Sequence, residues 1–206
     1  MYFDENGRET CEWATEKFPE NLRKYHDEEW GIPTRASFVD DSLFELLTLE
    51  IFQAGLSWQI VLNKRAGFRE NFYDFGIEKV AKMNEFDAEK LLEKPEIIRN
   101  KMKIEATINN AKIIREKFPK NGDFAKYIWH FTDGKIVKNE YKNFRETPAK
   151  TELSEEISRE MKKLGFKFTG PVAIYSYLQG VGIVNDHSRN CWRHDAKPAE
   201  NPFAKL

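Results

Sequence analysis

Two cysteines and two histidines at opposite ends of the chain have side chains that bind a soft metal ion. Cys11 and His26 lie near the N-terminus, and His187 and Cys191 lie four positions apart near the C-terminus. Two side chains at that spacing can reach one ion from a single turn of chain. Two thiolates and two imidazoles make a closed tetrahedral zinc set, which favours a structural role. Spacing alone leaves two alternatives open, a pair of buried free thiols and a disulfide that joins the termini.

A second group of residues combines aromatic rings with one carboxylate. Trp13 lies in CEW, Tyr25 and Trp30 in YHDEEWG, and Glu50 and Trp58 in LEIFQAGLSW. Aromatic faces attract a flat cationic ring by about 0.5–2 kcal/mol each, and an ionised carboxylate adds charge and hydrogen bonds. These residues therefore predict a slot for a flat, electron-poor ring. In the alternative interpretation the tryptophans belong to the core and Glu50 reaches solvent.

Helices are expected to position both groups. The capping box from Ser42 to Glu45 predicts a helix that ends near Gly55, and Ser57 predicts a cap for a helix to about residue 65. Asp87 is expected to cap a third helix. Further helices are expected from Pro95 to about 114 and over 124–131. No alternating strand pattern, repeat or low-complexity linker is present, so the fold class is all-α.

A helix pair near the C-terminus is the best-marked element. Ser154 is expected to cap a helix that Gly165 ends, and Pro171 begins the next helix after GFKFTG. This layout predicts a helix-hairpin-helix element at about 154–182, which presents backbone N–H groups to phosphates. An ordinary corner between two helices is the alternative. The candidate DNA-binding residues here are Lys163, Gly165, Lys167 and Gly170.

Charge is segregated although the net charge is only −1. Residues 97–120 carry seven basic and two acidic side chains, and residues 161–193 carry five basic side chains and one acidic. Two such segments favour a face that binds a polyanion. The polar opening MYFDENGRET predicts no secretory signal, and no apolar run is long enough to span a membrane. We therefore expect a cytoplasmic protein, in which a disulfide is rare.

Several motifs in order resemble the 3-methyladenine DNA glycosylase I family over about residues 9–193. The motifs are C-x-W (11–13), YHDEEWG (25–31), E-x-x-QAGLSW (50–58), IIRNKMKI (97–104) and GFKFTGP…NDH-x₃-C (165–191). The resemblance implies a helix-hairpin-helix DNA glycosylase fold, a single unit over 1–206 with two packed helical lobes. It also implies one structural zinc that ties the termini together. The zinc ligands fall on Cys11, His26, His187 and Cys191, and the base pocket falls on Trp13, Tyr25, Trp30, Glu50 and Trp58.

The resemblance also implies an activity, the hydrolysis of the N-glycosidic bond of 3-methyladenine in alkylated double-stranded DNA by a monomer. Ionised Glu50 is the expected catalytic residue, because it favours a cationic alkylated base over neutral adenine. Leu56 is expected to fill the space that the extruded nucleotide leaves. No lysine lies in the helix VAIYSYLQGVGI, so no lyase activity is expected. The alternative is a non-enzymatic, zinc-stapled DNA-binding module that senses alkylation.

Two further residues, Phe52 and Asp186, each have two possible roles. Between Glu50 and Gln53 the family is expected to have small or polar residues, whereas this chain has Ile51 and Phe52. Phe52 narrows the slot if it points inward and is neutral if it packs in the core. Asp186 is expected to support the metal site rather than to stabilise a sugar cation.

Overall fold

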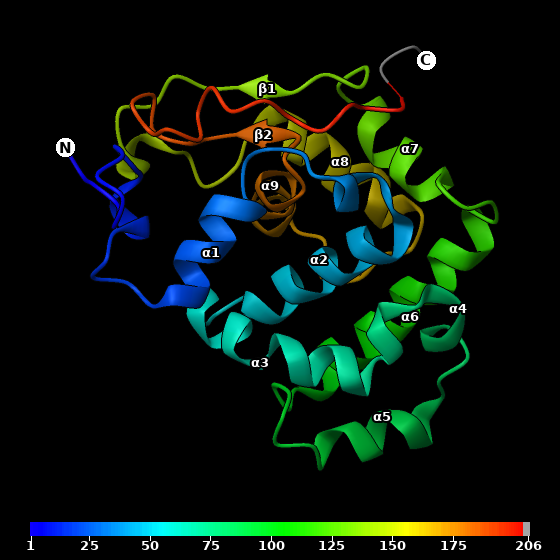
Figure 1. Ribbon diagram of the computed structural model, residues 1–206. Helices are drawn as coiled ribbons and strands as arrows, with labels where there is room; N and C mark the ends of the chain where they lie inside the picture. The colour runs from blue at the N-terminus through cyan, green and yellow to red at the C-terminus, as the bar shows by residue number, and fades with distance from the viewer. Residues whose placement is uncertain (204–206) are drawn as a thin grey trace.

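Helix α2 (Asp40–Gln53) lies at the centre of the molecule, and most of its residues are buried (Figure 1). Its apolar residues surround the axis instead of following one stripe, which is the pattern of a helix covered on all sides. The computed structural model describes residues 1–203. Within them the chain is mostly helical, so the all-α prediction is confirmed.

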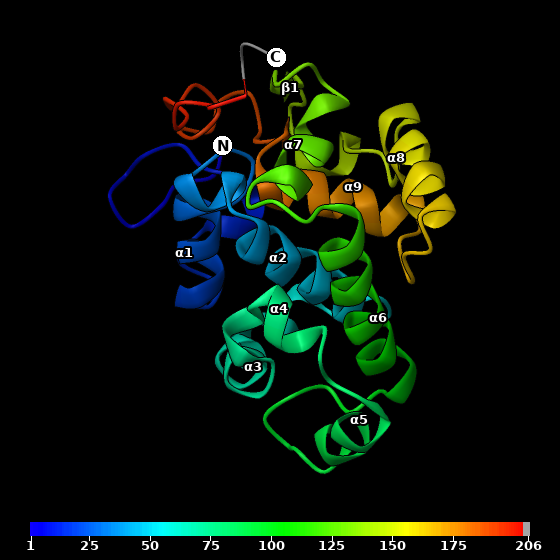
Figure 2. The same cartoon turned by 90° about the vertical axis from the view of Figure 1, so that its right-hand side faces the viewer.

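Helices gather on two sides of α2 (Figures 1 and 2). On one side lie α3 (Trp58–Asn71), α4 (Ile77–Val80), α5 (Glu85–Leu92) and α6 (Lys101–Lys117). On the other side lie α7 (Asp123–His130), α8 (Glu152–Lys163) and α9 (Pro171–Val181), while α1 (Glu20–Glu28) packs against α3. Short 3₁₀ turns complete the set: η1 (Glu12–Ala14), η2 (Arg35–Phe38), η3 (Tyr73–Phe75) and η4 (Phe144–Glu146).

One short sheet, absent from the sequence prediction, orders the C-terminal segment. Strand β1 (Val137–Lys138) pairs in parallel with β2 (Val184–Asn185). Both β2 residues are buried. The pairing fixes the segment that follows α9, and this segment carries two of the candidate metal ligands.

The predicted cap of α2 is wrong, and Asp40 explains why. The helix begins two residues before Ser42, at Asp40, and Ser42 caps nothing. The Asp40 carboxylate instead accepts the backbone N–H groups of Gly122 and Ala125, at 2.8 Å each, and so caps α7. Glu45 does not turn back on the helix either, because it binds arginines of α3.

Three other helix starts also differ from prediction. Helix α5 begins after Asn84, whose side chain accepts N–H groups of its first turn, with Asp87 as the second member of the capping box. Helix α6 begins after Asn100 rather than at Pro95. Helix α8 begins after Thr151, with Ser154 as its capping-box partner. In each case an upstream polar side chain has the better geometry to accept N–H groups. Helix α3 starts after Ser57 as predicted, but the Ser57 side chain makes no capping hydrogen bond and the helix extends to Asn71.

The hairpin between α8 and α9 matches the predicted layout. Gly165 has a φ of +97°, a conformation that favours glycine, just after the end of α8. Gly170 precedes Pro171, the first residue of α9. In the part of the chain that the structure describes, no helix combines the length and apolarity needed to cross a bilayer.

Candidate active site and metal centre

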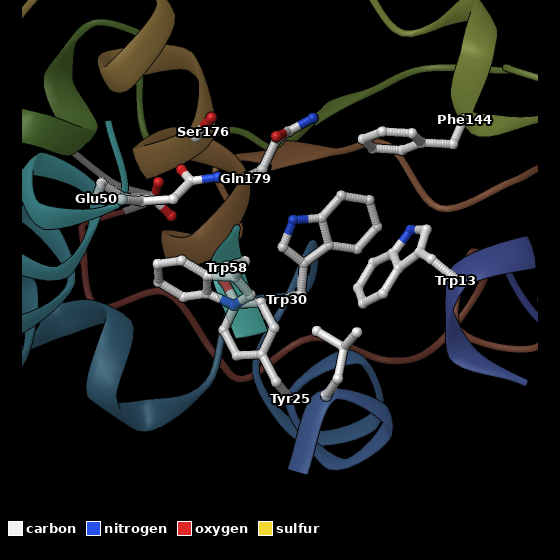
Figure 3. A pocket seen from close by; sticks show the side chains of 10 residues that line it. Trp13, Tyr25, Trp30, Glu50, Trp58, Phe144, Ser176 and Gln179 are labelled. Carbon is white, nitrogen blue, oxygen red and sulfur yellow. The ribbon is translucent and has the colours of Figure 1, made fainter. Parts of the chain in front are cut away.

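A cavity of about 260 Å³ opens between η1, α1, α2, α3 and α9. It contains all five residues that the sequence predicts for a ring-binding slot, although they come from η1, α1, α2, α3 and the loop after α1 (Figure 3). Its lining residues are Trp13, Leu22, Tyr25, Trp30, Glu50, Gln53, Trp58, Phe144, Ser176 and Gln179. We call this cavity the base slot. Five lining residues were not predicted from the sequence: Leu22, Gln53, Phe144, Ser176 and Gln179. The last three reach the slot only because the fold brings η4 and α9 to it.

The aromatic walls of the base slot pack against one another. Tyr25 and Trp58 have ring centroids 5.2 Å apart and are tilted by 51°. Trp13 and Trp30 meet edge to face at 5.0 Å. The indole nitrogens of Trp13 and Trp58 are buried and have no hydrogen-bond partner within residues 1–203. The walls are therefore rigid and carry donors free to meet a ligand.

Glu50 reaches the base slot from the last turns of α2 and is only 4% exposed. Its Oε2 atom has no hydrogen-bond partner among the described residues. Burial raises the pKa of this carboxyl group to about 8, because no nearby cation compensates the lost hydration. Burial therefore favours the protonated form of Glu50 in the empty slot, whereas the expected catalytic role needs the ionised form.

Lys103 fixes the C-terminal end of α2. Its ammonium group donates to the carbonyl oxygens of Phe52 at 3.0 Å and Ala54 at 2.7 Å. These are carbonyls that a helix end leaves without partners. From the sequence, Lys103 belonged to a basic, polyanion-facing segment and to the family motif IIRNKMKI (97–104). Its charge instead lies inward, where it holds the turn that leads to Leu56.

The turn after α2 presents Leu56 at the surface. Gly55 adopts a φ of +86°, and the backbone N–H of Leu56 donates to the carbonyl of Gln53 at 2.6 Å. Leu56 is 39% exposed. Phe52, in contrast, is completely buried against Phe68 with ring centroids 4.6 Å apart. Phe52 therefore belongs to the core and does not narrow the base slot.

A network of ion pairs holds α1, α2 and α3 together around the base slot. Arg65 donates to Glu29 and Glu45, and Arg69 donates to Glu45, at 2.7–3.1 Å. Hydrogen bonds from the two arginines hold the pKa of Glu45 below its usual value in spite of burial. Since Tyr25 and Trp58 lie on two of these helices, the network sets the spacing of the slot walls.

The hairpin is held from behind by Asn110 of α6, which is fully buried. Its amide accepts the backbone N–H of Lys167 at 2.8 Å and donates to the Lys167 carbonyl at 3.1 Å. The Lys167 side chain is exposed. Lys163 is also exposed and pairs with Glu160 at 2.7 Å. The structure thus presents both lysines on the surface near the hairpin.

A second buried cluster consists of Cys11, His26, His187 and Cys191, whose ligand atoms all lie within 4.8 Å of one another. We call these four side chains the metal cluster. Nδ1 of His187 lies 3.6 Å from Sγ of Cys11 and 3.7 Å from Sγ of Cys191. Nε2 of His26 lies 3.5 Å from Sγ of Cys191 and 3.1 Å from Nδ1 of His187. These separations suit ligands about 2.0–2.3 Å from one shared ion.

The outer ring nitrogens of this cluster are occupied, which fixes the tautomers. Nε2 of His187 donates to the carbonyl of Trp30 at 2.8 Å, and Nδ1 of His26 donates to Asp27 at 2.7 Å. The remaining nitrogens therefore face the thiols as lone-pair donors. Gly31 has a φ of +72°, and a Cβ there would lie 2.7 Å from the His187 ring. The cluster can hold a metal ion, and both cysteines are free rather than joined in a disulfide.

Asp186 does not support the metal cluster, contrary to expectation. Its buried carboxylate accepts hydrogen bonds from Tyr175, from Gln179 at 2.6 Å and from Asn139 at 2.7 Å. The outer nitrogen of the neighbouring His187 is already bound to the Trp30 carbonyl. Asp186 therefore acts on α9, and through Gln179 it orients a side chain of the base slot.

Known proteins resemble this chain over nearly its whole length. The methyladenine glycosylase family model matches residues 13–194. DNA-3-methyladenine glycosylase of Haemophilus influenzae is 39% identical over 183 residues, which cover 88% of this chain and 95% of that protein. DNA-3-methyladenine glycosylase 1 of Escherichia coli K12 is also 39% identical over 183 residues, covering 89% and 95%.

Solved structures show the same fold. A crystal structure of 3-methyladenine DNA glycosylase I has a TM-score of 0.81 at 38% identity and covers 89% of this chain and 98% of that chain. A variant 3-methyladenine DNA glycosylase I in complex with 3-methyladenine has a TM-score of 0.82 at 32% identity and covers 92% and 98%.

Proposed function

The chain belongs to the methyladenine glycosylase family, and we propose that it removes 3-methyladenine from alkylated DNA by hydrolysing the N-glycosidic bond. It is an enzyme of base excision repair. The observation that carries this proposal is the base slot, where an unpartnered buried carboxyl group lies between aromatic walls. Relatives named DNA-3-methyladenine glycosylase support the same assignment.

Glu50 selects the base by charge. A carboxylate in an apolar slot is unfavourable without a partner, and a cationic ring is such a partner. An N3-alkylated adenine is cationic in DNA, so its entry favours ionised Glu50. The proton of the Glu50 carboxyl group then leaves to solvent. Neutral adenine offers no such compensation. Tyr25 adds a hydrogen bond, and Trp13, Trp30 and Trp58 form the walls.

The base reaches the slot only after extrusion from the duplex. Exposed Leu56, on the tight turn beside the slot, fills the vacated stack and offsets the loss of stacking. The hairpin at Gly165 and Gly170 binds backbone phosphates, together with Lys163 and Lys167. The partner is thus double-stranded DNA that contains alkylated bases.

Hydrolysis needs little acid catalysis, because the positive charge already weakens the glycosidic bond. Water attacks the sugar as the base departs. No lysine is among the residues that line the base slot within the described chain, and a lyase needs an amine nucleophile there. We therefore propose a monofunctional enzyme that acts as a monomer.

The metal that best fits the buried cluster is a single structural zinc ion. Two sulfur and two nitrogen ligands, with both outer imidazole nitrogens hydrogen-bonded, support this choice. Cys11 and His26 would hold the N-terminal side of the ion, and His187 and Cys191 the C-terminal side, so that zinc stabilises both ends of the chain. Free cysteines support a reducing, cytoplasmic setting.

The experiment that tests the function is incubation of the protein with methylated duplex DNA, followed by chromatographic identification of any released base. We expect free 3-methyladenine and no strand cleavage. If damaged DNA binds but no base is released, the non-enzymatic DNA-binding module replaces this proposal. Borohydride trapping of a covalent protein–DNA adduct would contradict the monofunctional assignment.

A further inference from the structure

Gln179 of α9 is a polar residue of the base slot whose orientation is fixed from outside the slot. Its Nε2 donates to Oδ2 of Asp186 at 2.6 Å. A carboxylate accepts hydrogen bonds and does not donate them, so only the nitrogen end of the Gln179 amide can face Asp186. The Asp186 carboxylate is itself held by Tyr175 and Asn139. The amide of Gln179 therefore cannot turn over without loss of a buried, charge-assisted bond.

This orientation leaves the amide oxygen of Gln179 as an acceptor in the base slot. Gln179 is 6% exposed and lines the slot. Within residues 1–203 its Oε1 has no protein donor, yet it is not among the buried polar atoms that are sealed from solvent. The free acceptor accordingly faces the cavity.

The other polar side chains of the slot can adapt, and this sets Gln179 apart. The amide of Gln53 has no hydrogen-bond partner in the described chain, so it can present either its oxygen or its nitrogen. The hydroxyl group of Ser176 can rotate to donate or accept. The Glu50 carboxyl group only accepts hydrogen bonds when ionised and can also donate one when protonated. Among the slot groups that could present either a donor or an acceptor, Gln179 is the one whose hydrogen-bonding state its partner fixes.

The acceptor lies near the carboxyl group that recognises the base. Gly180, the residue after Gln179, lies close to Tyr25 and Glu50. A Cβ at Gly180 would lie 3.1 Å from the Tyr25 hydroxyl and 3.9 Å from Oε1 of Glu50. Helix α9 thus borders the slot opposite α2, and Figure 3 shows Glu50 and Gln179 coming from these two helices. Two acceptors on two helices suit a planar amine, which has two N–H groups that point in different directions.

We propose that Gln179, held by Asp186, accepts a hydrogen bond from the exocyclic amine of the extruded base and thereby selects 3-methyladenine over 3-methylguanine. The inference rests on the proposed function of the same slot. At the position of that amine, 3-methylguanine carries a carbonyl oxygen, which would face the Gln179 oxygen without a proton between them. A slot built to accept from an amine rejects an analogue that lacks it, because the buried acceptor is left unpaired.

The test measures two lesions in one reaction. Methylated duplex that contains both 3-methyladenine and 3-methylguanine is incubated under single-turnover conditions, and both released bases are quantified. We expect the wild-type protein to release 3-methyladenine much faster. Gln179→Met keeps the length of the side chain and removes the acceptor, so it should lower the ratio of the two rates by about tenfold or more. A general loss of folding or of DNA binding lowers both rates and leaves the ratio unchanged.

Gln59→Met is the matched control, because Gln59 lies on α3 outside the slot and binds Asn21 and Asn63. The same substitution there should leave the ratio at its wild-type value. An unchanged ratio in Gln179→Met would overturn the inference. A wild-type protein that releases no 3-methyladenine would instead overturn the proposed function.

Asp186→Asn tests the orienting role of Asp186, since an asparagine can donate as well as accept. Gln179 can then turn its nitrogen toward the slot and offer a donor to the carbonyl of 3-methylguanine. We expect the ratio to fall in this variant, and to show no further fall when Asp186→Asn is added to Gln179→Met. If Asp186→Asn leaves the ratio unchanged, or if it lowers the ratio equally in both backgrounds, Asp186 does not act through Gln179.

Discussion

The metal cluster and the base slot are adjacent buried polar sites that share one wall. Trp30 lines the slot, its carbonyl oxygen accepts from His187, and its ring lies 4.8 Å from the His187 ring. In the metal cluster the outer histidine nitrogens have partners, and the inner ligand atoms converge on one point. In the base slot the Oε2 of Glu50 and the indole nitrogens of Trp13 and Trp58 have none within the described residues.

This difference separates a site that holds the fold from a site that binds a ligand. Buried polar groups in native proteins are nearly always paired, so unpaired ones need an explanation. One bound ion would satisfy all four ligand atoms of the metal cluster. His187 of this cluster holds Trp30 through its backbone carbonyl and its ring. The base slot is left incomplete on a rigid frame, and a cationic base completes it.

Loss of one metal ligand should produce the largest effect. Cys191→Ser is expected to lose the zinc ion and to lower the free energy of unfolding by about 4–5 kcal/mol, because it breaks a buried set of ligands. For a chain of this size this corresponds to a melting temperature roughly 10 °C lower. Calorimetry with metal analysis measures both, and hydrogen exchange should show both termini loosened while the central helices stay protected.

Chelation supplies the control for that experiment. Removal of metal from the wild-type protein should reproduce the melting temperature of Cys191→Ser and leave the variant itself unchanged. Wild-type protein purified without chelator that holds no stoichiometric zinc would refute the structural metal, and the contrast between the two sites would then disappear.

The second prediction concerns the stability of the empty base slot as pH changes. The pKa of Glu50 is raised from an ordinary value of 4.5 to about 8 by burial. Protonated Glu50 therefore contributes to the free energy of unfolding relative to the ionised form. This contribution is fully present below pH 4.5 and is lost as pH rises through 8. Relative to Glu50→Gln, which does not titrate, the wild-type protein should lose about 3 kcal/mol between pH 5.5 and 8.5.

Urea unfolding of both proteins across this range measures that difference. Both carry the same metal cluster, so its own pH dependence cancels in the comparison. Parallel stability curves for the two proteins would mean that Glu50 finds a partner in the empty slot.

Third, Glu50→Gln should reduce excision while the metal cluster stays intact. The substitution keeps the volume and removes the charge, so the single-turnover rate should fall by roughly 10- to 100-fold, or about 1.5–3 kcal/mol. The affinity for free 3-methyladenine, followed by tryptophan fluorescence, should fall less, because the free base can be neutral at pH 7. Zinc content and DNA binding should remain normal. Excision at the wild-type rate would make the carboxyl group structural.

The smallest effect is expected at residues outside both sites. Lys167→Ala and Lys163→Ala should weaken binding to damaged and undamaged duplex alike, and each should reduce the slope of log affinity against log salt by about one unit per lost phosphate contact. Zinc content and the ratio of released bases should not change. Equal salt slopes in the variants and the wild-type protein would show that the hairpin does not contact phosphate.

Local signals in the sequence predicted the helices better than their ends. The α9 start at Pro171 is as predicted, because Gly170 and Pro171 have few alternatives. The α2 start is wrong because Ser42 and Glu45 look like a local capping box, whereas α2 begins at Asp40, and Asp40 and Glu45 bind partners 82 and 20 residues away in sequence. A capping pattern states which bonds are possible locally, and the tertiary partners decide which of them form.

Residue types indicated the candidate chemistry of the two sites: sulfur and imidazole ligands at both ends of the chain, and a carboxyl group among aromatic rings. They left free thiols, a disulfide or a tryptophan core as alternatives, and the ordered family motifs selected among them. Only the tertiary structure decided that the pKa of Glu50 is raised in the empty slot, since that pKa depends on burial and on the absence of a nearby cation. Likewise, Gln179 entered the base slot and acquired a fixed orientation only when α9 packed beside α2 and Asp186 came within hydrogen-bond distance. Electrostatics and hydrogen-bond direction depend on what surrounds a group in space, and that information is not carried by neighbours in sequence.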